Sequence, residues 1–145
     1  MLRILTFISL CILSSCTNKS ASEQSLTKAE QVRYEQYFVE GRQLYNQHCS
    51  NCHQANGEGV GKLFPPIKSS DFMGNNFDQV ICLMQNGISG EITVNGVNFN
   101  QPMPGVQGLT NLEVAEIATY IYNTWEHQRG YIDVKSVNKI LVTCQ

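Results

Sequence analysis

The chain has 145 residues, the length of a single domain. Its formal net charge of −2 and pI of about 5.9 leave it without the basic character of a nucleic-acid-binding protein. Its cysteines stand at positions 11, 16, 49, 52, 82 and 144.

The N-terminus has the pattern of an export signal. Arg3 precedes an apolar run over residues 4–13, which is shorter than the ~20 residues needed to span a bilayer. The letters LSSC at 13–16 resemble the lipobox of bacterial lipoproteins, which implies cleavage before Cys16 and a lipid on that cysteine. The alternative is an ordinary signal peptide that contains Cys16. We therefore expect a lipoprotein signal peptide at 1–15.

Residues 16–30 form the next predicted segment, a lipidated flexible tether. From residue 17 on they are rich in Ser, Lys, Glu and Gln, and Leu26 is the one large apolar residue. Such a segment buries too little apolar surface to order itself. A flexible chain of this length reaches on the order of 20 Å.

A helix is predicted next, at the start of a domain that we place at 31–130. Aromatic and apolar residues between positions 29 and 48 recur at steps of three and four, which marks one face of a helix. This helix leads directly into the stretch HCSNCHQANGEGVG at 48–61.

The Cys-x-x-Cys-His motif admits three chemistries. Thiol exchange of the thioredoxin type needs a strand before the cysteine pair, and here a helix precedes it. A structural zinc site needs four ligands, and the other histidines, His48 and His127, form no second pair. Haem attachment accounts for all the fixed residues of the motif, because the two thiols bond the haem vinyl groups while the adjacent histidine binds the iron. We expect one covalent haem c on Cys49 and Cys52, with His53 as an axial ligand.

Together with this motif, two helix patterns resemble the class I cytochromes c, over about residues 35–127. Gly41 and Tyr45 match the glycine and aromatic of the family's N-terminal helix, and Ile117 and Tyr120 match its C-terminal helix. The resemblance implies an all-α fold, with four or five short helices around the haem. It also implies that the two helices cross at the glycine.

The resemblance extends to the surroundings of the axial histidine. In the family, that histidine bonds a backbone carbonyl at a proline after a glycine-rich loop, which implies Pro65 or Pro66 here. The loop glycines are expected to let the chain turn tightly around the haem edge. These are Gly57, Gly59 and Gly61.

Met103 is the predicted second axial ligand. It lies in NQPMPGV, where two prolines restrict the backbone without a regular element, and this matches the family's methionine loop. Met84 is expected to pack in the core, and Met73 is a weaker candidate. His48 and His127 are poorly placed to reach the opposite face of the haem.

Two further elements are predicted around this ligand. Asn95-Gly96 between β-patterned runs at 92–94 and 97–99 predicts a small hairpin before the methionine loop. Residues 131–145 form a C-terminal extension, in which Asp133 is expected to cap a short helix.

The remaining cysteines, Cys82 and Cys144, are candidates for a disulfide. An oxidising compartment favours such a bridge. Two separate buried thiols are the alternative.

These features predict an electron carrier with His/Met-ligated haem and no small-molecule substrate at the iron. We expect redox proteins as partners. We also expect the protein to lie on the periplasmic side of the cytoplasmic or outer membrane, where its lipid anchors it. The alternatives are a cytochrome subunit of an exported dehydrogenase, reductase or oxidase, a haem sensor or peroxidase, and a thiol oxidoreductase.

Overall fold

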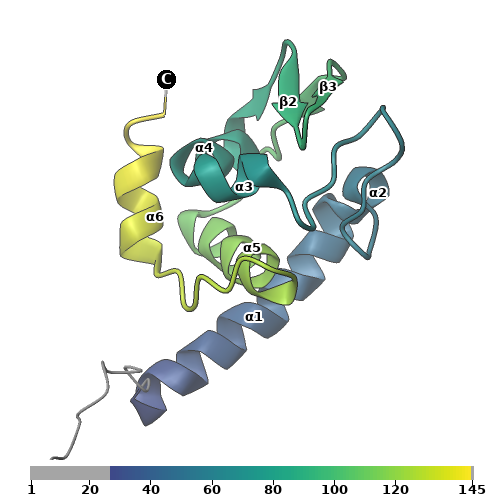
Figure 1. Ribbon diagram of the computed structural model, residues 1–145. Helices are drawn as coiled ribbons and strands as arrows, with labels where there is room; N and C mark the ends of the chain where they lie inside the picture. Colours follow the sequence, from purple (N-terminus) through teal and green to yellow (C-terminus); the bar gives the residue numbers. More distant parts are fainter. Residues whose placement is uncertain (1–26, 145) are drawn as a thin grey trace, which may run out of the picture.

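Two long helices cross each other, α1 (Lys28–His48) along one edge of the molecule and α5 (Asn111–Thr124) against it (Figure 1). The computed structural model describes residues 27–144, so the predicted signal peptide and lipidated Cys16 lie outside it. These two helices each begin with a capping box, at Thr27 and Thr110 respectively. Helix α1 begins at Lys28, three residues before the predicted start of the domain at residue 31.

The crossing occurs at Gly41, as the resemblance implied. A side-chain carbon there would overlap the backbone carbonyl of Glu116, and it would also approach Tyr120 on α5. The two backbones therefore touch at a point where only glycine fits.

Four shorter helices complete the described part of the chain. They are α2 (Ser50–His53), α3 (Asp71–Asn75), α4 (Phe77–Asn86) and α6 (Val134–Leu141). The prediction of a mainly helical fold is confirmed. The helices outnumber the four or five predicted, because α2 and α3 are one turn each and too short to show a period in sequence.

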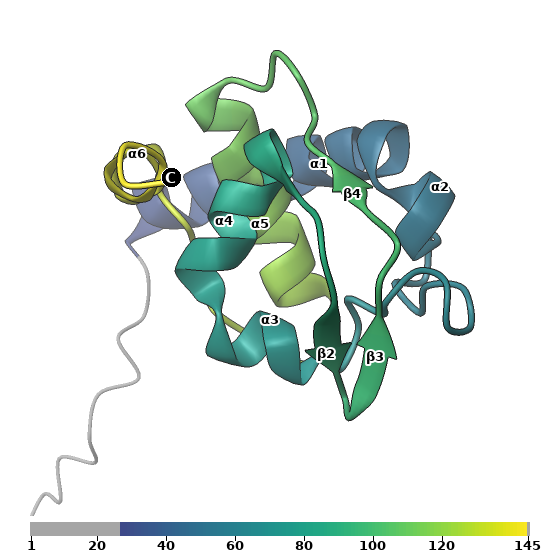
Figure 2. The ribbon, with the colours of Figure 1, turned by 90° about the horizontal axis from the view of Figure 1, so that it is seen from above.

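The described residues form two small antiparallel sheets. The predicted hairpin is present as β2 (Ile92–Val94) and β3 (Val97–Phe99). Its turn residues Asn95 and Gly96 both have positive φ, as a type I′ hairpin turn requires. The second sheet, which was not predicted, pairs β1 (Gly87–Ile88) with β4 (Met103–Pro104). Figure 2 labels strands β2, β3 and β4.

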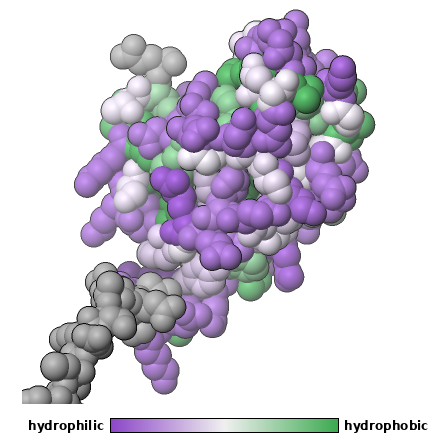
Figure 3. All heavy atoms as spheres, viewed as in Figure 1, coloured by the Kyte–Doolittle hydropathy of each residue, from purple (hydrophilic) through white to green (hydrophobic). Residues whose placement is uncertain are grey.

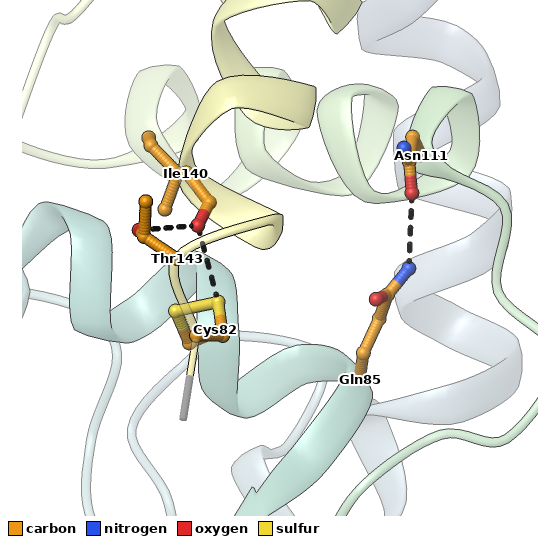
Figure 4. The surroundings of a disulfide bond; sticks show 6 residues. Cys82, Gln85, Asn111, Ile140 and Thr143 are labelled. Atoms are coloured by element: carbon orange, nitrogen blue, oxygen red, sulfur yellow. Dashed lines mark hydrogen bonds between the residues drawn. A yellow bond between two sulfur atoms is a disulfide. The ribbon is translucent and has the colours of Figure 1, made fainter.

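The C-terminal extension packs against α4 and α5. Asp133 caps α6 as predicted, and Val137 on that helix is fully buried. A disulfide between Cys82 on α4 and Cys144 closes the chain end onto the domain (Figure 4). The extension is thus a covalently held part of the fold.

The face seen in Figure 3 is covered mainly by hydrophilic residues. Among residues 27–144, no helix has the length and apolar character needed to cross a membrane.

Candidate functional site

The cysteine motif occupies a single tight turn at the end of α1. The Cys49 N–H donates to the Tyr45 carbonyl at 2.9 Å, which closes α1, and the His53 N–H donates to the Cys49 carbonyl at 3.0 Å. Cys49, Cys52 and His53 all line one cavity of about 280 Å³. The spacing of the motif therefore brings two thiols and an imidazole to the same wall.

His53 is held by a single backbone acceptor. Its ring is buried, and Nδ1 donates to the Pro65 carbonyl at 2.9 Å. Of the two candidate prolines, Pro65 therefore supplies the acceptor. Burial lowers the pKa of His53, and the bond to Pro65 opposes that shift. The neutral ring, with Nε2 free to bind a metal, is favoured.

The glycine-rich loop brings Pro65 to the histidine. The Gly59 N–H donates to the His53 carbonyl at 3.0 Å, and Gly59 has a φ of +67°. A side-chain carbon at Gly59 would overlap the Phe64 carbonyl, while one at Gly57 would overlap the ring of Trp125. These two glycines are required by close contacts, whereas Gly61 has open space around it.

Met103 reaches the same cavity from β4. The prediction that prolines alone would hold it, without a regular element, is wrong. Met103 pairs with Ile88 of β1, and the Val106 N–H donates to the Met84 carbonyl at 2.9 Å. Backbone bonds to the end of α4 and to β1 therefore fix the methionine segment.

The rest of the cavity lining is largely apolar and comes from α1, the loop before α3, helices α3, α4 and α5, strand β1 and the hairpin. We did not predict that Val94 and Phe99 of the hairpin line this cavity. The alternation in ITV and VNF was a usable signal, since it places every second side chain on one face. The main apolar lining residues are Tyr45, Phe64, Ile67, Phe72, Val80, Leu83, Ile88, Ile92, Val94, Phe99, Ile117 and Ile121.

The other ligand candidates separate into two groups. Met73 and Met84 are each 5% exposed and also line the cavity. The histidines His48 and His127 do not line it. His48 is exposed at the end of α1, and the His127 ring packs on Tyr122 with 5.6 Å between ring centroids.

The Cys49 thiol is unsuited to exchange chemistry. Both motif thiols are free, and burial, with a smaller contribution from Cys52, raises the pKa of Cys49 to about 12. Exchange thiols need the opposite shift, because the thiolate is the nucleophile. Within residues 27–144, no three His, Cys, Asp or Glu side chains are grouped to hold a metal ion. The raised pKa of Cys49 therefore argues against a reactive dithiol at this site.

The residues at this cavity fit a haem. An apolar slot suits a large flat macrocycle, two adjacent thiols suit covalent attachment, and an imidazole and a thioether on the lining suit axial ligation of iron.

Comparisons with known proteins agree with this interpretation. Residues 38–125 match the family described as "Cytochrome c". The chain is 29% identical over 91 residues to "Cytochrome c-552" of Thermus thermophilus, which covers 60% of this chain and 69% of that protein. A second "Cytochrome c-552", from a particular strain of the same species, is also 29% identical over 91 residues, with 61% of its length covered.

Proposed function

The chain belongs to the cytochrome c family, and we propose that it is an exported one-electron carrier whose haem iron is closed on both sides by protein ligands. Membership in this family of electron-transfer proteins implies covalently bound haem c. The bound group supplies a one-electron couple at its iron.

Cys49 and Cys52 attach the group in this proposal. Each thiol would be held by a C–S bond to one haem vinyl carbon, with the thiol proton carried to the neighbouring vinyl carbon, so that no leaving group is needed. The observation that carries the proposal is that both free thiols share one apolar cavity with the His53 and Met103 side chains.

His53 and Met103 serve as the axial ligands. The Pro65 carbonyl holds His53 Nδ1 at 2.9 Å and leaves Nε2 for the iron. The Met103 thioether would supply the second ligand from its place on the cavity lining, and such a ligand raises the reduction potential. With both positions filled, the iron has no site for a substrate.

The surroundings of this carrier are also proposed. The signal peptide at 1–15 directs export, the lipid on Cys16 holds the protein at the periplasmic side of a membrane, and the tether lets the domain reach its partners. The formal charge of −2, made more negative by haem propionates, favours basic redox partners and a salt-sensitive encounter.

The test compares two methionine variants of the holoprotein by absorption spectroscopy. Met103→Leu and Met84→Leu each keep the side-chain volume and remove one thioether from the cavity lining. We expect Met103→Leu to lose the iron–thioether charge-transfer band and Met84→Leu to keep it. Loss of the band in Met84→Leu alone would overturn the assignment of Met103.

A further inference from the structure

The β2–β3 hairpin has one face on the cavity and one face in solvent. Val94 and Phe99 are 2% and 4% exposed and line the cavity with Ile92. On the opposite face, the exposed Thr93 hydroxyl donates to the Asn98 side chain at 3.0 Å. The hairpin is thus a section of the cavity wall, and because a pair of three-residue strands is only marginally stable by itself, it depends on contacts with the rest of the domain.

Asn95, in the turn of this hairpin, is bonded to a distant part of the chain. Its backbone N–H donates to Asp71 Oδ1 at 2.7 Å, and its side-chain Oδ1 accepts from the Asp71 N–H at 2.9 Å. Its Nδ2 also donates to the Ser69 carbonyl at 3.0 Å. Three hydrogen bonds therefore join one turn residue to the start of α3, 24 to 26 positions earlier in the sequence.

The backbone of Asn95 suits this role. Its φ of +51° lies in the left-handed region, which asparagine tolerates better than most residues. Glycine and asparagine both suit this backbone conformation. Only asparagine has a side chain that can make the hydrogen bonds to α3 and Ser69. Figure 2 shows the hairpin beside α3.

We propose that Asn95 is a positioning residue that fixes the hairpin over the haem cavity, limits water access to it, and so raises the reduction potential of the iron. The inference rests on the proposed function. Its physical basis is that the apolar shell around a metal controls solvent access and local dielectric, and through them the reduction potential. A hairpin released from α3 admits water, which stabilises the more highly charged oxidised iron.

The test uses Asn95→Gly in the holoprotein. Glycine keeps the left-handed turn and changes no charge, but it removes both bonds made by the side chain. Thr93→Val is the matched control, since it removes one bond on the solvent face of the same hairpin. The readouts are the reduction potential and the hydrogen exchange of the hairpin amides.

We expect Asn95→Gly to keep the six-coordinate spectrum, to lower the potential and to speed amide exchange in the hairpin about tenfold. Thr93→Val is expected to keep the wild-type potential. A wild-type potential in Asn95→Gly, or the same decrease in Thr93→Val, would overturn the inference and leave the carrier function intact. A wild-type protein without methionine ligation would instead overturn the proposed function, and the inference with it.

Discussion

Gly41 determines how closely the two long helices approach. It is buried on α1, and a side-chain carbon there would overlap the Glu116 carbonyl on α5. Because backbone lies on both sides of this contact, a larger residue must push the helices apart. The aromatic contacts beside it, such as Tyr45 with Tyr120 at 5.4 Å between centroids, depend on the same approach.

Gly41→Ala is therefore expected to destabilise the holoprotein by about 1–3 kcal/mol or more, as overpacking of a close-packed contact does. Gly74→Ala is the matched control, since Gly74 also lies in a helix and its new methyl group would meet only His127, at 3.8 Å. That change should cost nothing or stabilise by up to about 1 kcal/mol. Guanidinium chloride unfolding measures both variants, and equal losses would contradict this account of the crossing.

At the residue scale, the sequence predicted which side chains form the haem site. It did not predict which backbone atoms hold those side chains in place. The cysteines and His53 follow from a local motif, since one turn of chain sets their spacing. The choice of Pro65 over Pro66 depends on how Gly59 closes the loop against Phe64, which is a tertiary contact. The bonds of Asn95 to Asp71 were not predictable for the same reason.

At the element scale, the two small sheets differ in how strongly the sequence specifies them. The β2–β3 hairpin was predictable because Asn95-Gly96 sits between two alternating runs. The β1–β4 pair joins two-residue segments that are separated by the whole hairpin, so neither segment shows a period. A side-chain carbon at Gly87 would overlap the Met103 carbonyl, which shows how close this pairing is.

Helix α6 depends on one carboxylate at its start. Asp133 Oδ1 accepts from the N–H groups of Lys135 and Ser136, at 2.9 and 3.1 Å. The hydrogen bond from the Ser136 side chain is the main cause that lowers the pKa of Asp133, and the backbone bonds add to it. Because the pKa is lower in the folded state, the stabilisation is present above the unfolded pKa and is lost as pH falls through the folded one.

Asp133→Ala is expected to lower the free energy of unfolding by about 0.5–2 kcal/mol at neutral pH, as loss of an N-cap does. The difference from wild type should shrink at a pH well below the usual aspartate pKa of about 3.9. Denaturant unfolding of both proteins across this pH range measures it. A difference that stays constant with pH would contradict the role of the charged cap.

At the scale of the whole molecule, the cavity is the centre of the fold. Helices α4 and α5, the hairpin and the methionine segment all place apolar side chains on it. The general architecture was predicted through the resemblance to the class I cytochromes c, which rests on the haem motif and the two helix patterns. The set of residues that lines the cavity was not predictable, because residues as far apart in the sequence as Cys49 and Ile121 come together only in the folded structure.

The fold is therefore expected to depend on the attached haem. A protein with both Cys49→Ala and Cys52→Ala should be largely unfolded, because the apolar cavity walls then face water and small domains have little stability in reserve. Far-ultraviolet circular dichroism measures the loss of helix.

The control for that experiment is a Cys82→Ser, Cys144→Ser protein. It loses the disulfide but keeps the haem cysteines, so it should stay folded while losing about 2–4 kcal/mol. Native-like helical dichroism in the protein without Cys49 and Cys52 would contradict the dependence on haem.

In the proposed carrier, the iron is closed on both sides, so that only an electron is exchanged. The most direct measurement is a reversible redox titration of the wild-type holoprotein, followed by exposure of the reduced form to carbon monoxide, with Met103→Leu beside it. We predict a one-electron transition and an unchanged reduced spectrum under carbon monoxide for wild type, and carbon monoxide binding only in the variant. Ready binding of carbon monoxide by the wild type would contradict the proposed role as an electron carrier. It would indicate an open coordination position on the iron, as in a sensor or a peroxidase.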